Sequence, residues 1–148
     1  MLFFAALLLA QTVPQQCAAM DTNLPASLAV WATPGPGVPD DLTRPVLLKA
    51  VPKDEIRDLP ATAKEGGATG IDFDIDKPGI YGIAIDQGAW IDVVPEGGEP
   101  LVSVKHGHGP ECSTIRKIVR FDLKPGTYRL YVSGLTSVNV KVLLVSGE

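Results

Sequence analysis

Residues 70–85 read Gly-Ile-Asp-Phe-Asp-Ile-Asp-Lys-Pro-Gly-Ile-Tyr-Gly-Ile-Ala-Ile, and this stretch decides the fold class. Apolar and acidic residues alternate over residues 71–76, which is the period of a strand with one buried face. The turn signal Lys77-Pro78-Gly79 follows, because proline presets the φ of a tight turn and glycine accepts a positive φ. A second apolar run begins at Tyr81. The stretch therefore predicts two short strands joined by a tight turn.

The same signals recur along the rest of the chain. Each apolar run is shorter than a typical helix and rich in β-branched residues, and turn signals separate several of the runs. We therefore expect a single all-β domain, an antiparallel sandwich or jelly-roll-like fold of about eight short strands. The expected strands span residues 44–51, 71–75, 81–85, 89–94, 101–105, 118–123, 128–133 and 138–145.

One segment of the chain echoes another. Residues 73–81 (FDIDKPGIY) and 121–128 (FDLKPGTY) both end an amphipathic strand, pass through a Pro-Gly turn and open the next strand with a tyrosine. We interpret each copy as a β-hairpin whose tyrosine packs over the bend. The motif resembles the F-x-L-x-P-G-x-Y hairpin of secreted β-sandwich modules such as the bacterial pre-peptidase C-terminal family. The resemblance covers roughly residues 70–148 and implies the sandwich fold.

The N-terminal part of the chain differs in character. Residues 2–10 are all apolar, too few to span a bilayer but suited to the hydrophobic region of a signal peptide. We expect a signal peptide over residues 1–19, with cleavage after Ala19 or, alternatively, after Ala10. No later stretch is long enough for a membrane span, so the protein is expected in the periplasm or outside the cell.

The mature protein is expected to be one domain. Residues 20–69 form an irregular N-terminal segment that carries the first strand, and residues 70–148 form the core of the sandwich. A short helix is predicted over residues 24–31, with Asn23 as its N-cap and Pro25 near its first position. The proline- and glycine-rich residues 34–39 predict a loop, and residues 61–69 predict a second, polar one.

The chain has two cysteines, Cys17 and Cys112. In an oxidising compartment an even number of cysteines suggests a disulfide. Cleavage after Ala19 would remove Cys17 and leave a lone thiol, whereas cleavage further upstream would keep the bridge. Both outcomes stay open at the level of the sequence.

The formal net charge of −4 argues against a nucleic-acid partner, because no cluster of lysine and arginine offers a phosphate footprint. Arg116, Lys117 and Arg120 come nearest to such a cluster, and they straddle an expected strand, which indicates ordinary surface charges. Asp72, Asp74 and Asp76 line one strand face about 6–7 Å apart, which is too far to share one calcium ion. We expect them to form a solvated outer face that also discourages edge pairing.

Both histidines of the chain lie in residues 105–112, Lys-His-Gly-His-Gly-Pro-Glu-Cys. If the strand expected at residues 101–105 continues, His106 and His108 project to one face, as residues i and i+2 do. With Glu111 or Cys112 arriving after a turn, two imidazoles could bind zinc, copper or iron. The alternative is a glycine-rich surface loop with two solvated histidines. Cys112 as a nucleophile lacks a visible third group to orient a histidine.

Residues 90–94 (WIDVV), 106–110 (HGHGP) and 112–117 (CSTIRK) resemble a group of small exported bacterial proteins. Some of these carry the automatic label homogentisate 1,2-dioxygenase, an iron-dependent cupin. The first cupin motif, G-x5-H-x-H-x3,4-E-x6-G, fits His106 and His108, but only two residues separate His108 from Glu111. Pro100 and Ile118 stand where the motif has glycines, and no histidine remains for the second motif. The resemblance thus implies at most a 2-His-1-carboxylate iron site of His106, His108 and Glu111.

The sequence favours a non-enzymatic binding or structural protein over an enzyme. No phosphate-binding glycine loop, nucleophile elbow or pair of catalytic carboxylates is present, and no catalytic residue is expected. The expected partner is a protein, a glycan or a small molecule, with no cofactor other than a metal at the histidine loop. The iron-dependent dioxygenase is the alternative. The aromatic residues that could stack on a sugar, or else fill the core, are Trp31, Tyr81, Trp90, Tyr128 and Tyr131.

Overall fold

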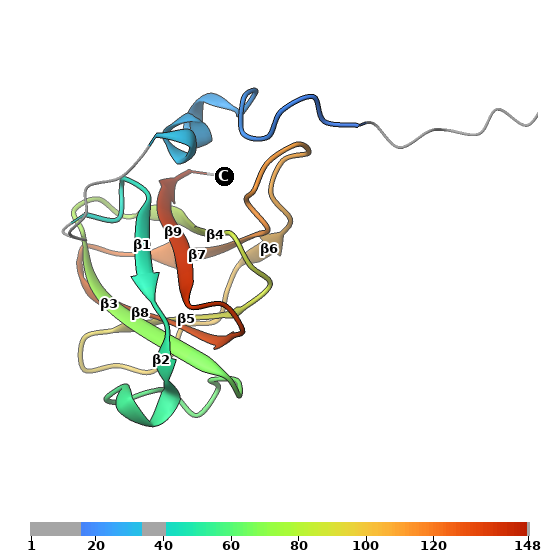
Figure 1. Ribbon diagram of the computed structural model, residues 1–148. Helices are drawn as coiled ribbons and strands as arrows, with labels where there is room; N and C mark the ends of the chain where they lie inside the picture. The colour runs from blue at the N-terminus through green and yellow to red at the C-terminus, as the bar shows by residue number, and fades with distance from the viewer. Residues whose placement is uncertain (1–15, 34–40, 148) are drawn as a thin grey trace, which may run out of the picture.

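The computed structural model describes residues 16–33 and 41–147, which form a sandwich of two antiparallel sheets (Figure 1). The predicted all-β sandwich is confirmed. The apolar stretch at residues 2–10 and the loop expected at residues 34–39 lie outside the described residues. No helix among the described residues has the length and apolar character needed to cross a membrane.

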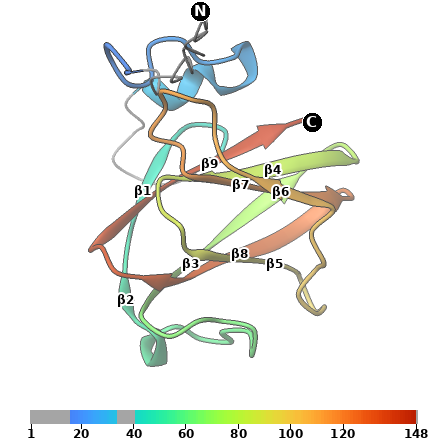
Figure 2. The ribbon, with the colours of Figure 1, turned by 90° about the vertical axis from the view of Figure 1, so that its right-hand side faces the viewer.

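Figure 2 shows the two sheets as two stacked layers. One sheet has five strands in the order β1-β9-β4-β7-β6, and the other has four in the order β2-β3-β8-β5. The five-stranded sheet consists of β1 (Val46–Lys49), β4 (Gly79–Ile85), β6 (Lys105–Gly107), β7 (Lys117–Leu123) and β9 (Asn139–Ser146). The four-stranded sheet consists of β2 (Val51–Pro52), β3 (Gly67–Ile75), β5 (Trp90–Pro95) and β8 (Gly126–Leu135).

The two Pro-Gly turns connect the sheets to each other, so the prediction of two hairpins is wrong. The turn after Ile75 leads from β3 in the four-stranded sheet to β4 in the five-stranded sheet, and the turn after Leu123 leads back from β7 to β8. A Pro-Gly turn bends the chain in the same way whether the next strand pairs with the previous one or crosses to the facing sheet. Which strands pair is decided by the other strands of the sheet, and this cannot be predicted from the sequence around the turn.

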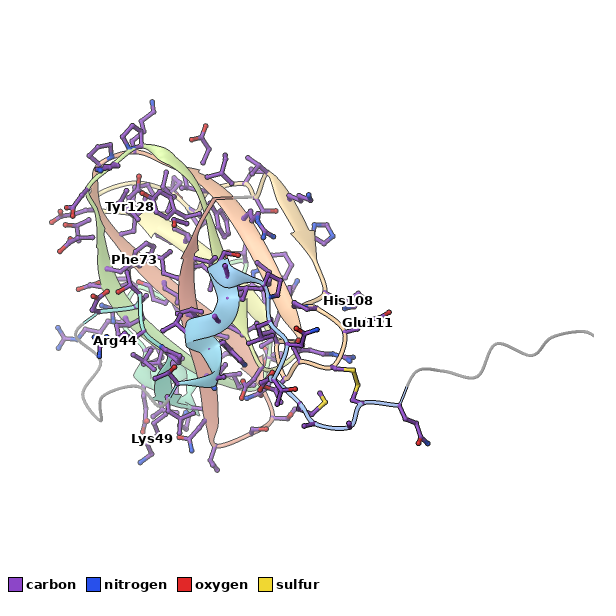
Figure 3. All side chains as sticks on the ribbon, turned by 90° about the horizontal axis from the view of Figure 1, so that it is seen from above. Arg44, Lys49, Phe73, His108, Glu111 and Tyr128 are labelled. Carbon is purple, nitrogen blue, oxygen red and sulfur yellow. A yellow bond between two sulfur atoms is a disulfide. The ribbon has the colours of Figure 1, made fainter. Side chains whose placement is uncertain are left out.

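Each Pro-Gly turn with its two flanking strands is called a crossing here, because it carries the chain from one sheet to the other. The strands of one crossing pair with the strands of the other. Phe73 on β3 lies opposite Tyr128 on β8, and Tyr81 on β4 lies opposite Phe121 on β7. The rings of Phe73 and Tyr128 stack with centroids 5.6 Å apart, and both side chains lie close together in Figure 3. Each copy of the echoed motif therefore supplies the aromatic partner of the other copy, and the two crossings form one unit.

Each tyrosine also anchors its own turn, as the sequence suggested. The hydroxyl of Tyr128 donates to the carbonyl oxygen of Lys124 at 2.8 Å and accepts from its backbone N–H at 3.0 Å. The hydroxyl of Tyr81 donates to the carbonyl oxygen of Lys77 at 2.7 Å. These bonds satisfy backbone groups that a bend leaves without a strand partner.

The strand expected at residues 44–51 is split between the two sheets. β1 pairs with β9, and after Ala50 the chain continues as β2, which pairs with β3. The backbone N–H of Ala50 itself donates to the carbonyl oxygen of Val138 at 2.9 Å. This direct passage covalently closes one side of the sandwich. Figure 2 shows β1 above β2 on that side and β6 above β5 on the other.

The strand expected at residues 101–105 is displaced to β6, Lys105–Gly107. The backbone N–H of Leu101 donates to Val93 on β5, whereas the N–H of Val104 donates to Arg120 on β7. Because residues 101–104 bond to both sheets in turn, they cannot form a continuous ladder with either. At the other boundary β3 begins at Gly67, inside the loop expected at residues 61–69.

The central strands of the five-stranded sheet, β4, β7 and β9, carry buried residues on both faces. On β9, Val140 and Val142 face the main core between the sheets, whereas Leu143 and Val145 face a second cluster on the outer side. This explains why the apolar residues of β9 run nearly without interruption. Figure 2 shows the N-terminal segment lying over that outer side.

A 3₁₀ helix, η1 (Ala26–Ala32), covers the second cluster and replaces the α-helix expected at residues 24–31. It starts after Pro25 with no side-chain cap, so the predicted N-cap role of Asn23 is wrong. The Trp31 side chain is fully buried, and its Nε1 donates to Thr114 Oγ1 at 2.9 Å. The burial of Trp31 against other parts of the fold therefore holds this segment in place, whereas the predicted helix cap contributes nothing.

The two Pro-Gly turns differ in one testable respect. Gly126 has a φ of +151°, whereas Gly79 lacks a positive φ, and a Cβ at either position would meet no atom closer than 3.7 Å. We expect Gly126→Ala to destabilise the protein by about 1–2 kcal/mol, since a side chain disfavours that backbone conformation. Gly79→Ala is the matched control and should change the free energy of unfolding by less than about 0.5 kcal/mol. Equal values in urea denaturation would contradict this description of the crossings.

Candidate functional site

The histidine loop lies at the outer edge of the five-stranded sheet. His106 is the middle residue of β6, opposite Val119 of β7, and His108 follows the end of the strand. Both histidines and Glu111 are exposed, and Figure 3 shows His108 and Glu111 at the side of the molecule where the disulfide also lies. β6 ends at Gly107, so the continuous strand that would place both imidazoles on one face stops between them.

The expected metal ligands do not form a cluster in this structure. Among residues 16–33 and 41–147, no three His, Cys, Asp or Glu side chains are grouped closely enough to hold a metal ion together. Cys112 is in a disulfide and is not a thiolate ligand. A zinc, copper or iron site at His106, His108 and Glu111, including the iron centre that the dioxygenase label implies, stays a prediction.

The glycines of this loop have a packing role. A Cβ on Gly109 would lie 2.2 Å from the carbonyl oxygen of Ile115 and 2.6 Å from its Cβ, so the two sides of the loop approach more closely than any side chain allows. Ile115 is buried in the second cluster. Close backbone contact thus explains the glycine at this position.

The disulfide between Cys17 and Cys112 is present and ties the N-terminal segment to this loop (Figure 3). Asp21 makes a second attachment. Its carboxylate accepts from the backbone N–H of Thr114 at 2.7 Å and from the Thr114 hydroxyl at 2.5 Å, and its own N–H donates to the carbonyl oxygen of Cys112 at 2.9 Å. Residues 17–21 are therefore part of the folded domain.

A cavity of about 480 Å³ with the character of a binding site lies at the open side of the sandwich. It lies between β5, the edge strand of the four-stranded sheet, and strands β6 and β7 of the five-stranded sheet, next to residues 100–103 of the connecting loop. This volume falls within the usual range of small-molecule sites. The lining residues are Thr62, Trp90, Ile91, Asp92, Pro100, Leu101, Val102, Ser103, His106, Lys117, Val119 and Phe121.

The walls of the cavity are mostly apolar, with one buried carboxylate. Asp92 is only 4% exposed, and both of its oxygens have partners: one accepts from the Thr62 hydroxyl at 2.9 Å and the other from Trp90 Nε1 at 3.0 Å. These bonds fix the Trp90 ring at the mouth, where it is 38% exposed. Val102 on the opposite part of the rim is 89% exposed, so the mouth presents apolar surface to solvent.

Two ammonium groups flank Trp90. Lys64 Nζ lies 4.6 Å and Lys117 Nζ 5.6 Å from the centroid of the tryptophan ring, within the range of cation–π attraction. The Lys117 ammonium also donates to the carbonyl oxygen of Ala89 at 2.8 Å. Lys117 is partly buried, and this loss of hydration lowers the pKa of its ammonium below the ordinary lysine value.

A smaller hollow of about 220 Å³ adjoins the cavity and shares His106 and Lys117 with it. Its remaining lining residues are Gly88, Gly107, His108 and Arg116. Within the described part of the chain no acidic residue lines this hollow, and its ionisable lining groups are all basic.

Sequence reasoning named some of these residues but not the site. Trp90 was an aromatic candidate for sugar stacking and His106 a metal candidate, but Lys117 was interpreted as a surface charge. Asp92 gave one usable signal, because an acidic residue within the apolar run 89–94 needs a partner if that run is an edge of the core. The cavity itself could not be predicted, because the sequence does not show which side of the sandwich stays open.

The aspartates of β3 form a solvated outer face. Arg129 on β8 pairs with Asp72 at 2.9 Å, and the Thr127 hydroxyl donates to Asp74 at 2.7 Å. These are cross-strand contacts on an exposed sheet face, as the sequence suggested.

Comparisons with protein-family models, with curated proteins and with solved structures found no match to this chain.

Proposed function

We propose that this protein is an exported, non-enzymatic binding protein that takes a small molecule with an apolar part into the cavity at the open side of the sandwich. The cavity carries the proposal. Its apolar walls supply binding free energy, and a few fixed polar groups supply orientation, which is the usual composition of a small-molecule site. Trp90 and Val102 extend the apolar surface to the mouth, where solvent reaches them.

A small molecule is favoured over a glycan by the surroundings of Trp90. A sugar stacks on a free aromatic face, but here the Lys64 ammonium lies 4.6 Å from the ring centroid. This ammonium group lies over one face of the ring. The ring edge is also committed, since Nε1 donates to Asp92. Trp90 therefore serves as a fixed wall of the mouth.

Export is supported by the disulfide and by the apolar stretch at residues 2–10. Disulfides persist in oxidising compartments and are rare in the cytosol. Because the bridge uses Cys17, we propose that the signal peptide is cut upstream of Cys17. This choice resolves the conflict between the two cleavage sites that the sequence left open.

The binding proposal predicts that the neutral dye N-phenyl-1-naphthylamine binds the mature protein with a Kd of roughly 10 μM, about −7 kcal/mol. Val102→Asp should weaken dye binding at least about tenfold, because a carboxylate at the rim must be desolvated when the dye enters. Dye fluorescence during titration measures both values.

Val138→Asp is the matched control. Val138 is 77% exposed and lies between β8 and β9, where the chain contacts Ala50 at the closed side of the sandwich. This variant should bind the dye as the wild type does, and thermal unfolding should show both variants folded. A wild type that does not bind the dye, or equal losses in the two variants, would contradict the proposed function.

The export proposal predicts the mass of the protein recovered from the periplasm or the medium. Its N-terminus should lie after the apolar stretch at residues 2–10 and before Cys17, and reduction should add one hydrogen per cysteine. Mass spectrometry of the intact protein with and without reductant measures both. A mature chain that starts at Met20, or one with two free thiols, would disprove the proposal.

A further inference from the structure

The basic side chains beside the cavity are arranged on one wall. Lys117 and His106 line both the apolar cavity and the smaller hollow, and Arg116 and His108 line the hollow alone. They come from β6, β7 and the loop between these strands, so all four belong to the five-stranded sheet side. The one carboxylate in the cavity, Asp92, belongs to β5 on the other wall. The cavity thus has one basic and one acidic wall.

The charged groups of the two walls differ in how much of their hydrogen-bonding capacity is already used within the protein. Both oxygens of Asp92 accept hydrogen bonds from Thr62 and Trp90. In the described part of the chain, Lys117 has the carbonyl oxygen of Ala89 as its hydrogen-bond partner and forms no ion pair. An ammonium has three donors, so two donors of a partly desolvated cation remain for a ligand. Arg116 and His106 likewise form no ion pair among the described residues.

We propose that the cavity takes an amphipathic anion, with its apolar tail between the sheets and its carboxylate or phosphate head in the basic hollow against Lys117, Arg116 and His106. This inference rests on the proposed binding function and names the ligand class. The two hollows share Lys117 and His106 as lining residues, so a molecule whose tail fills the larger cavity meets these two side chains at the border with the basic hollow. Charge-assisted hydrogen bonds to the head would replace the hydration that Lys117 loses by burial.

The acidic wall contributes to the same selectivity. Asp92 is only 4% exposed and both of its oxygens already accept hydrogen bonds from protein groups, so an ammonium head has little access to this carboxylate. Its charge also repels a second anion from the β5 side. A ligand with one anionic end therefore enters in one orientation.

Displacement of bound N-phenyl-1-naphthylamine by a matched set of eight-carbon compounds tests this inference. Octanoate and octyl phosphate carry anionic heads, octanamide has the same chain with a neutral head, and octylammonium has a cationic one. We expect octanoate to displace the dye at about tenfold lower concentration than octanamide, and octylammonium to be the weakest. The octyl phosphate titration distinguishes a phosphate head from a carboxylate head as the preferred anion.

Substitutions on the basic wall locate the head. Lys117→Gln should reduce the preference for octanoate over octanamide to less than about threefold and leave octanamide unchanged. Because Lys117 is partly buried, Arg116→Gln, at an exposed position, provides a second variant that should also reduce the preference. Lys49→Gln is the control, since it removes one positive charge from β1 at the opposite edge of the same sheet, far from His108 in Figure 3.

Equal displacement by octanoate and octanamide would overturn the inference while leaving the binding function intact, because the dye itself is neutral. A preference for octanoate that persists in both Lys117→Gln and Arg116→Gln would also overturn it, since the head would then lie elsewhere. Absence of dye binding by the wild type is a separate result and contradicts the proposed function first.

Discussion

The fold depends on the reciprocal pairing of the two crossings between the sheets. Phe73 pairs with Tyr128 in one sheet and Tyr81 with Phe121 in the other, so each crossing completes the core of its counterpart. Neither crossing can move to another register without separating both pairs, because a slip of one residue sends each ring to the opposite face of its sheet. The stacked pair adds roughly 0.5–1.5 kcal/mol beyond the burial of its rings.

The binding site follows from this architecture. The crossings fix β3, β4, β7 and β8 at the centre, and the remaining strands extend the sheets toward two sides. On one side the chain passes directly from β1 to β2 and closes the sandwich. On the other side β5 continues to β6 only through the longer segment 96–104, in which Leu101 donates one hydrogen bond to β5 and Val104 donates one to β7. The cavity lies on this open side, where apolar core surface and basic edge residues meet.

Apolar and polar residues that alternate in the strands with one buried face, together with short β-branched runs between turn signals, were sufficient to predict the fold class and most strands. This alternation was not sufficient to predict which strands pair. A Pro-Gly turn occurs both in hairpins and in crossings between sheets, so the prediction of a hairpin was wrong for both copies of the motif. The single strand predicted at residues 44–51 proved to be two strands in different sheets for a similar reason, because no sequence signal at Ala50 indicates a change of sheet. Cys17, Cys112 and Trp90 were recognised individually, but the roles of Lys117 and Asp92 depend on neighbours from other strands.

The central claim is that the open side of the sandwich receives a ligand, and backbone amide chemical shifts test it most directly. During titration of the ¹⁵N-labelled protein with N-phenyl-1-naphthylamine, the account predicts the largest shift changes in β5, in β6, in the first residues of β7 and in residues 100–104. Amides around Ala50 and Val138, at the closed side, should remain unchanged. Largest changes at the closed side, or changes spread evenly over both sheets, would contradict the account.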